Sequence, residues 1–313
     1  MSKVCYFTFV LMTVIGCLSV ELKDGQNLYY FLCLSIVITN IEETAASFGF
    51  LEGSVVAPML SYRVGAEKSS SKLGFSLAYY YLCIKLVITT TDKIMQSPTL
   101  SIPRLSALPF SAADVPVLLD NLGVAFQPIG CVNWPADYPY CPDVAFRMAW
   151  CPEGLVIHYR VDEQSVRAHY GVDDGNVWTD SCVECFIRNA DADAYYNIEC
   201  NCIGTILVGV GPVGDRHRLS LDDLKQVKRW ASLGNEPFEY REKNTAWEVA
   251  LVVPSSLFAG LPLCLEPDAT LRANFYKCGD DLRVPHFVSW SPIGVERPNF
   301  HKPEFFGHLH LQA

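Results

Sequence analysis

From residue 144 onward, apolar and polar residues alternate in short runs, a period that is typical of half-buried β-strands. Gly, Pro, Asp and Asn separate these runs, as they do in turns. The pattern predicts strands over Val144–Trp150, Leu155–Val161, Val166–Tyr170, Cys182–Arg188, Tyr195–Asn201, Gly204–Gly209, Phe238–Glu242, Ala246–Val252, Leu271–Lys277, Phe287–Trp290 and Leu309–Leu311. Short strands at this spacing predict an all-β fold, an antiparallel jelly-roll-like β-sandwich.

Two segments depart from this alternation and predict short helices. Over Leu221–Trp230, apolar residues recur at every third position on one stripe, and Ser220 precedes two aspartates as a helix N-cap does. Ala112–Leu122 is a second candidate, near the start of the β-rich part of the chain. We therefore expect one or two short helices beside the sandwich.

Three of the predicted strands carry a polar face opposite an apolar one. They span Cys182–Arg188, Tyr195–Asn201 and Leu271–Lys277, and their polar faces hold carboxylate, amide and guanidinium groups. The side chains concerned are Glu184, Asn197, Glu199, Asn201, Arg272 and Asn274. If these faces adjoin in one sheet, they form a hydrogen-bonding floor for a hydroxyl-rich ligand. The alternative is an outer sheet face that only meets solvent.

The composition changes sharply at Met95. Residues 1–94 contain one proline and equal numbers of acidic and basic residues, whereas residues 95–313 contain all six tryptophans, all seven histidines and the whole net charge. Segments this different are not expected to share one core, so we expect residues 95–313 to fold as a separate domain. The formal net charge of −10 excludes a generic binder of nucleic acid or of anionic membranes.

The first 94 residues form an apolar N-terminal extension with two interpretations. Val4–Val20 follows Lys3 and is built like the apolar region of a signal peptide, and its Val-Ile-Gly-Cys17 is similar to the acylation site of bacterial lipoproteins. That interpretation predicts a cell-envelope lipoprotein, with this segment as the chain's contact with a membrane. The alternative is that translation starts at Met95, which predicts a cytoplasmic domain and agrees better with the cysteine pattern below.

The cysteine and glycine motifs of the domain do not predict a metal or a nucleotide site. Nine of the thirteen cysteines follow Met95, mostly inside predicted strands, which indicates buried, reduced thiols. Cys182 and Cys185 are three residues apart in a strand, so they point to opposite faces and do not form a zinc pair. Gly209–Gly214 fits G-x-G-x-x-G, but Pro212 lacks the N–H that a phosphate needs, so we predict a turn.

One set of motifs is more specific. Residues 177–187 read Val-Trp-Thr-Asp-Ser-Cys-Val-Glu-Cys-Phe-Ile, and residues 287–292 read Phe-Val-Ser-Trp-Ser-Pro. Residues 300–309 read Phe-His-Lys-Pro-Glu-Phe-Phe-Gly-His-Leu, and two further strands, over 247–254 and 271–275, continue the pattern. Together these segments resemble the signature of family 9 carbohydrate-binding modules, most closely the stand-alone family 9-like proteins of the Bacteroides group.

The resemblance implies a jelly-roll β-sandwich that binds a mono- or oligosaccharide without cleaving it and takes part in polysaccharide utilisation. In that family, two aromatic rings hold a pyranose while a carboxylate, amides and an arginine bond its hydroxyls. Carried over by position, Trp178 is one aromatic wall, Glu184 is the acceptor, and Phe300 stands where the family has a second Trp. Further binding residues implied in this way are Arg272, Asn274, Trp290 and His301, and less directly Asn197, Glu199 and Asn201. Some relatives bind calcium, but this chain has no D-x-D-x-D loop, so we assign no cofactor and no metal ligand.

Two other functions stay open on the sequence. A glycan-processing hydrolase would use two of the carboxylates Glu184, Glu199, Glu248 and Glu304, because glycoside hydrolysis needs a pair about 5–10 Å apart. A haem-binding or redox sandwich would take its ligands from Met148 and the histidines. A product assay with saccharides separates the hydrolase from a binding protein, and a visible absorption spectrum tests for haem.

Overall fold

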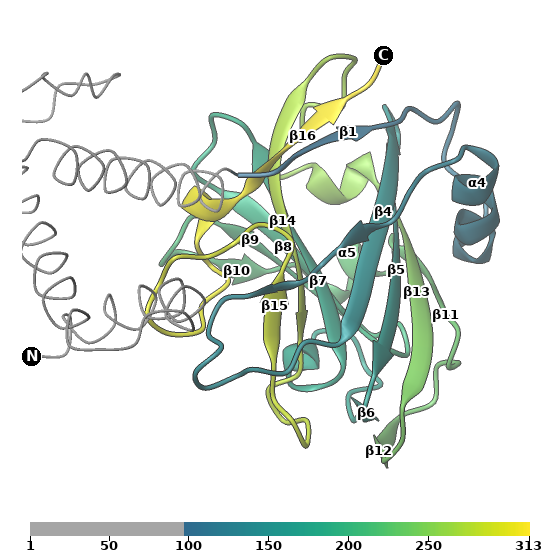
Figure 1. The fold of residues 1–313 in the computed structure, drawn as a ribbon. Coiled ribbons are helices and arrows are strands. Elements are labelled where there is room, and N and C mark those ends of the chain that lie inside the picture. The colour runs from purple at the N-terminus through teal and green to yellow at the C-terminus, as the bar shows by residue number, and fades with distance from the viewer. Residues whose placement is uncertain (1–96) are drawn as a thin grey trace, which may run out of the picture. The chain divides into compact units, whose positions relative to one another are not determined.

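The computed structural model describes residues 97–313, which form a β-sandwich of two main sheets (Figure 1). The larger sheet follows the order β1-β16-β14-β7-β8-β9-β10, with β15 on β14 and β3 on β15. Its strands are β1 (Thr99–Ile102), β3 (Cys131–Val132), β7 (Cys182–Asn189), β8 (Tyr195–Asn201), β9 (Ile206–Gly211), β10 (His217–Arg218), β14 (Thr270–Cys278), β15 (Phe287–Ser289) and β16 (Gly307–Leu311). Apart from the parallel pair β1–β16, these neighbours run antiparallel.

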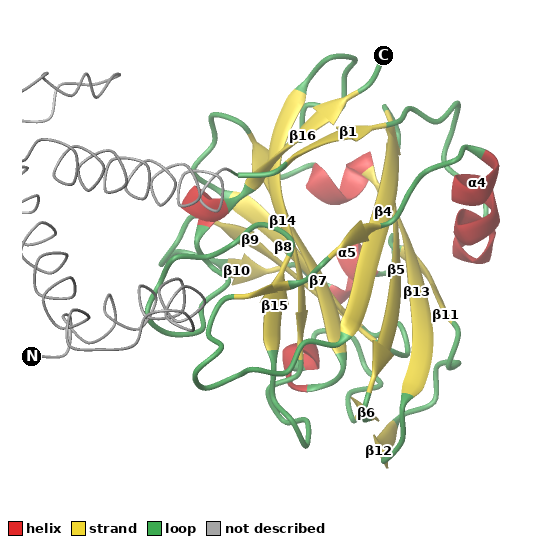
Figure 2. Ribbon diagram, in the orientation of Figure 1, coloured by secondary structure: helices red, strands yellow, loops and turns green. Residues whose placement is uncertain are grey.

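The smaller sheet follows the order β11-β13-β5-β4-β2, and β6 and β12 form a separate ribbon. These strands are β2 (Gln127–Pro128), β4 (Asp143–Cys151), β5 (Gly154–Glu163), β6 (Val166–Ala168), β11 (Lys228–Ala231), β12 (Phe238–Arg241) and β13 (Thr245–Pro254). Figure 2 shows that helices contribute little to the described part of the chain, which confirms the predicted all-β class.

The core lies between the two sheets and is built by the side chains that the alternation assigned to the apolar faces. On β7, Val183, Cys185 and Ile187 point inward and are fully buried. Across the interface, the rings of Phe146 on β4 and Phe275 on β14 stack with centroids 3.6 Å apart. Burial of each such side chain is worth about 1.5–3 kcal/mol, so this layer holds the two sheets together.

The predicted helix over Leu221–Trp230 is wrong in its length. Helix α5 covers only Leu221–Leu224, although Ser220 forms the expected capping box with Asp223. The chain then continues as β11, in which Trp230 pairs with Ala250 of β13. The spacing of three suits one helical turn, but the edge of the smaller sheet offers backbone hydrogen bonds that a longer helix would leave unused.

The second predicted helix is confirmed over most of its range. It consists of the short 3₁₀ turn η2 (Ala112–Asp114) and the helix α4 (Val115–Asn121). The remaining short turns are η3 (Val177–Thr179), η4 (Ser255–Phe258) and η5 (Pro303–Phe305). Helix α4 packs Val115 and Leu119 onto the outer face of the smaller sheet, so that face is covered.

The N-terminal extension lies outside the described residues. The apolar runs, the acylation motif at Cys17, and the domain boundary at Met95 therefore stay predictions. Within residues 97–313, no helix has both the length and the apolar character that a bilayer span requires.

Candidate functional site

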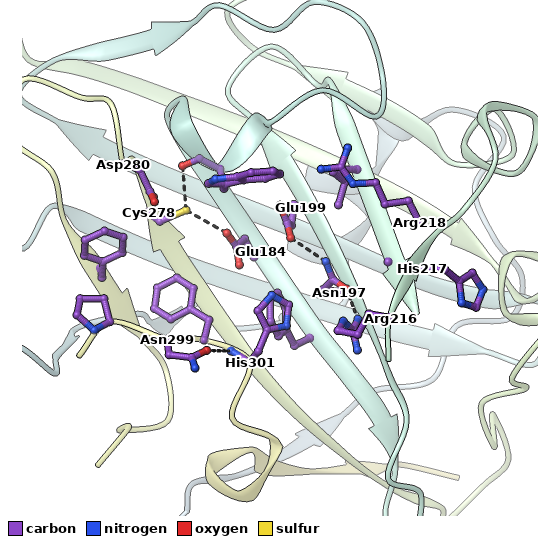
Figure 3. Close-up of a pocket in the computed structure, with 17 residues that line it drawn as sticks. Glu184, Asn197, Glu199, Arg216, His217, Arg218, Cys278, Asp280, Asn299 and His301 are labelled. Carbon is purple, nitrogen blue, oxygen red and sulfur yellow. Dashed lines mark hydrogen bonds between the residues drawn. The ribbon is translucent and has the colours of Figure 1, made fainter. Parts of the chain in front are cut away.

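The outer face of the larger sheet carries a cavity of about 510 Å³ over strands β7, β8 and β9. The strand register puts Glu184 of β7 directly opposite Glu199 of β8. Two residues further along β7, Phe186 faces Asn197 of β8, which in turn faces Gly209 of β9. The two polar strand faces on β7 and β8 do adjoin, as Figure 3 shows for Glu184, Glu199 and Asn197. They form the floor of the cavity.

Gly209 is the floor residue whose lack of a side chain matters. A Cβ atom there would lie 2.5 Å from Oδ1 of Asn197, closer than carbon and oxygen approach each other. The Asn197 amide therefore occupies the space above Gly209. Its Nδ2 donates a 2.7 Å hydrogen bond to Oε1 of Glu199, so the glycine allows the amide to orient the carboxylate.

Aromatic side chains stand around the polar floor. Trp178 belongs to the turn η3 directly before β7 and lines one side of the cavity, half-buried. Phe300 also lines the cavity, and its ring stacks on that of Tyr276 with centroids 4.1 Å apart. Phe287 packs edge-on against Phe300, with 6.1 Å between the centroids. The cavity thus combines π-faces with hydrogen-bonding groups.

The position of Trp178 depends on the buried carboxylate of Asp180. Its two oxygens accept hydrogen bonds from the backbone N–H groups of His169 and Tyr170, both at 3.0 Å, and Oδ2 also accepts from Nδ2 of Asn201. These bonds fix the turn that precedes β7. The Asp of the Trp-Thr-Asp-Ser motif therefore has a structural role, because it holds the tryptophan at the rim.

The two floor carboxylates are buried and lack a cationic partner. Glu184 and Glu199 are only 3% and 5% exposed, and no ion pair joins either to a basic group of residues 97–313. Burial raises the pKa of Glu199 to about 7. Burial, together with the neighbouring charge of Glu199, raises the pKa of Glu184 well above its ordinary value. Near neutral pH the pair therefore holds a proton, and it can both donate to and accept from hydroxyl groups.

The two carboxyl groups keep an acceptor oxygen that a ligand can use. Oε1 of Glu184 accepts a 3.0 Å hydrogen bond from Sγ of Cys278. Oε2 of Glu199 is buried and has no hydrogen-bond partner within the described part of the chain. A buried acceptor without a partner costs about 1–3 kcal/mol, so a hydroxyl group entering the cavity would be bound favourably.

Two arginines complete the site, and the sequence reasoning missed both. Arg216 donates to Oδ1 of Asn197 and lies with its guanidinium 3.8 Å from the centroid of the Tyr195 ring. Arg218 of β10 pairs with Gly209, donates to the carbonyl of Asp174, and lies 5.5 Å from the Trp178 ring centroid. The available signal was the Arg216-His217-Arg218 run, which follows the glycine-rich turn and Asp215.

The structure brings six of the predicted binding residues to the cavity lining. They are Trp178, Glu184, Asn197, Glu199, Phe300 and His301. Nδ1 of His301 shares a 2.7 Å hydrogen bond with the Tyr195 hydroxyl, and burial lowers the pKa of His301 to about 4. This imidazole is therefore neutral at physiological pH.

Four other predicted residues lie outside the cavity lining. Arg272 donates from Nε to the carbonyl of Phe306 at 3.0 Å, so it fixes the start of β16. Asn274 is fully buried, where its amide binds the backbone of Ser291. Both are on the expected face of β14, but their side chains are used in holding the following chain.

The other two residues serve the core and a turn. Trp290 is 9% exposed and packs between the sheets against Phe146 and Phe275. Asn201 accepts from the backbone N–H groups of Ile203 and Thr205, at 3.3 and 3.0 Å, and so closes the turn between β8 and β9. We leave Arg272, Asn274, Trp290 and Asn201 out of the proposed binding set.

The structure also places the residues that the sequence analysis named for haem binding, hydrolysis and a zinc pair. Met148, offered as a haem ligand, is buried in the core between the sheets and does not reach the cavity. Of the four glutamates named for hydrolysis, Glu184 and Glu199 line the cavity, together with Asp280, whereas Glu248 and Glu304 do not. Cys182 and Cys185 lie on opposite faces of β7, as predicted.

A β-sandwich with an aromatic-rimmed polar cavity on one outer face is suited to binding hydroxyl-rich molecules. Residues 113–311 match the family model described as Carbohydrate-binding family 9, so the chain belongs to that family, as the motifs predicted.

Solved structures give further similarities. A crystal structure from Bacteroides uniformis, described as a candidate carbohydrate-binding protein, is 46% identical over 69% of this chain and 100% of that one, with a TM-score of 0.66. A family 9 module from Caldicellulosiruptor kristjanssonii in complex with cellotriose is 11% identical over 69% of this chain and 94% of that one, with a TM-score of 0.43. A family 9 module from Caldicellulosiruptor kristjanssonii in complex with glucose is 11% identical over 69% of this chain and 96% of that one, with a TM-score of 0.44. No protein with a curated description matches the chain.

Proposed function

We propose that this domain binds a mono- or oligosaccharide in the cavity over β7, β8 and β9, without cleaving it. The observation that carries the proposal is the pair Glu184 and Glu199, buried and facing each other below aromatic side chains. Membership of Carbohydrate-binding family 9 supports the same function. So does the description of the Bacteroides uniformis relative at 46% identity.

The proposed binding mode uses the two kinds of group in the cavity for the two kinds of sugar surface. The C–H face of a pyranose packs on the π-face of Trp178, and Phe300 supplies the second ring. The hydroxyl groups bond to Glu184, Glu199 and Asn197. The two carboxyl groups are partly ionised, so they form stronger hydrogen bonds than neutral groups do. A volume of about 510 Å³ lies within the range of small-molecule sites, about 300–1,000 Å³.

Phe300 makes the second wall smaller than an indole would be. A phenyl ring offers less stacking area than tryptophan and has no N–H group. Its stack on Tyr276 holds the ring in a fixed orientation. We therefore expect a single sugar unit to be held mainly by Trp178 and the floor, with Phe300 limiting how it enters.

One observation favours hydrolysis as a second candidate function. Opposed residues on neighbouring antiparallel strands have Cβ atoms about 4.5–5.5 Å apart, so the Glu184 and Glu199 carboxyl groups can approach the spacing found in glycosidases. Against this, glycosidases place their carboxyl groups on either side of the scissile bond. Glu184 and Glu199 stand side by side on one floor, and both would meet the sugar from below.

The test is a glycan array probed with the full chain, followed by titration calorimetry with the glycans retained. We expect saturable binding to a subset of glycans, and no new reducing ends after prolonged incubation. Release of reducing sugar that Glu199→Gln abolishes would support the hydrolase instead. If the folded protein binds no glycan, or if Trp178→Ala and Glu184→Gln bind as well as the unaltered chain, the proposed site is wrong.

A further inference from the structure

Two cysteines and a glutamate meet at the edge of the cavity. Cys182 is the first residue of β7 and Cys278 the last of β14, and the register places them directly opposite each other. Glu184 lies two residues further along β7, so its side chain emerges on the same face. The two Sγ atoms and a carboxylate oxygen all lie within 4.8 Å of one another, and all three residues are buried. Figure 3 shows Cys278 beside Glu184.

The spacing of these three atoms suits one metal ion. Zinc–sulfur bonds are about 2.3 Å long, so ligand atoms in a tetrahedral site lie about 3.5–4 Å from one another. Cys278 Sγ and Glu184 Oε1 are already 3.0 Å apart, so small side-chain rotations suffice to surround an ion. Two sulfur ligands select zinc or another thiophilic metal, and they exclude calcium, which takes oxygen ligands.

We propose that Cys182, Glu184 and Cys278 form a binding site for a thiophilic divalent cation such as Zn²⁺. The fourth coordination position faces the cavity, because Cys278 and Glu184 line it while Cys182 lies behind them. A water molecule or another oxygen ligand from the cavity fills that position. Such a site, with three protein ligands and one open position, differs from the closed sites that serve structure alone.

Metal entry must displace protons, since both thiols are protonated in the empty site. Burial raises the pKa of Cys182 to about 12 and that of Cys278 well above its ordinary value. Each sulfur exchanges its S–H bond for a metal–sulfur bond, and two protons leave through the cavity. Glu184, if protonated, releases a third. No group is oxidised or reduced, and the cation offsets the two thiolate charges that burial would otherwise forbid.

The other described cysteines do not share this geometry. Cys185 and Cys200 point into the sandwich core from the opposite face of the sheet. Cys264 and Cys141 are exposed. Cys185→Ala is therefore a matched control, because it removes a buried thiol from the same strand without touching the proposed site.

The experiment uses the full chain, reduced and freed of metal, and titrates it with Cd²⁺ in the absence of saccharide. Thiolate-to-cadmium charge transfer gives an ultraviolet band that reports sulfur ligation. We expect one tight equivalent per chain that persists in Cys185→Ala and disappears in Cys182→Ser and in Cys278→Ser. Glu184→Ala should bind at least about tenfold more weakly, because even groups that only support a ligand cost about that much. Zn²⁺ should displace the cadmium.

A second measurement covers the case in which a serine variant does not fold. Zn²⁺ added to the unaltered chain should slow alkylation of Cys182 and Cys278, read by peptide mass spectrometry, and leave the rate at Cys200 unchanged. If the tight equivalent survives in folded Cys182→Ser and Cys278→Ser, or if Zn²⁺ protects neither cysteine, the proposal is wrong. Because saccharide is absent from both measurements, their failure would leave the proposed carbohydrate binding untouched.

Discussion

The outer faces of the two sheets both bury charged side chains, but they treat them differently. On the smaller sheet, Arg147 donates to Asp120 at 2.6 Å, to the carbonyl of Pro116 at 3.0 Å and to Nδ1 of His158 at 3.1 Å. His158 in turn shares a 2.9 Å hydrogen bond with Glu248. Helix α4 and the loop after it close over this group, as Figure 1 shows for the helix beside β4 and β5.

The outer face of the larger sheet has the opposite arrangement. Glu184 and Glu199 face each other, and one oxygen of Glu199 has no hydrogen-bond partner among residues 97–313. A cavity lies above the pair where the smaller sheet has a helix. Burial raises the pKa of both carboxyl groups, so the fold keeps this pair at a cost in stability.

Buried charge on the smaller sheet therefore stabilises the fold, whereas buried charge on the larger sheet is available to a ligand. When every donor and acceptor of a network is paired beneath a covering helix, none is left to bind another molecule. The carboxyl pair below the cavity has both an unpaired acceptor and the space for a ligand. Substitutions on the smaller sheet should therefore change stability, and substitutions around the cavity should change binding.

The largest effect should come from Arg147→Ala. This change leaves Nδ1 of His158 and the Pro116 carbonyl without their common donor, and each buried acceptor left unsatisfied costs about 1–3 kcal/mol. Urea denaturation measures the free energy of unfolding. Arg160→Ala, an exposed position on the same strand pair whose guanidinium lies 4.3 Å from the Phe126 ring centroid, should change it by less than about 1 kcal/mol. Equal losses for the two variants would contradict the comparison.

Trp178→Ala should reduce saccharide affinity by roughly tenfold to a hundredfold. Loss of one stacking face costs about 1–3 kcal/mol of binding free energy. Titration calorimetry with a glycan from the array measures the change. Trp230→Ala, on the smaller sheet, should leave affinity unaltered while lowering the melting temperature. An effect on affinity from Trp230 and none from Trp178 would place the site elsewhere.

Glu184→Gln should weaken binding by about tenfold with little change in the melting temperature. The amide keeps the shape of the side chain but replaces one acceptor oxygen by a donor, and a hydrogen bond donated to a charged group is worth about 1.5–3 kcal/mol. Titration calorimetry and thermal denaturation measure the two effects. A variant that unfolds would show that Glu184 supports the fold, as Arg147 does.

Glu199 should make the protein less stable as pH rises. Its pKa of about 7 exceeds the ordinary value of 4.5, so the folded state binds the proton more tightly than the unfolded state does. The loss of folding free energy from ionising the buried Glu199 carboxyl group is absent below about pH 4.5, grows between pH 4.5 and pH 7, and is complete above pH 7. With a chelator present, Glu199→Gln should therefore raise the free energy of unfolding at pH 8 by on the order of 1 kcal/mol, and have no effect at pH 4.5. An unchanged pH profile would show that the pair is not desolvated.

Phe300→Trp should have the smallest effect. The larger ring adds stacking area at the second wall, so affinity should stay the same or rise by a few-fold. Titration calorimetry with the same glycan checks this. A clear loss of affinity would mean that the smaller ring leaves room that the ligand itself fills.

Much of this site follows from the sequence, because strand alternation is a local property. Period two assigned Val183, Cys185 and Ile187 to the core and Glu184 to the other face. The turn residues Trp178 and Asp180 lie so close to Glu184 in the chain that their motif alone places them together. The helix prediction over Leu221–Trp230 failed after its first turn, because the partner strand β13 is distant in the sequence.

What only the tertiary structure decided is which strands are neighbours. Pairing of β7 with β8 places Glu184 opposite Glu199, and pairing of β7 with β14 places Cys182 opposite Cys278. The same pairing left Arg272 and Asn274 on the expected face, yet committed them to the backbone of residues 306 and 291. The alternation of one strand determines the direction of each side chain. Its neighbours across the sheet depend on hydrogen bonds between segments far apart in the chain, which no local pattern encodes.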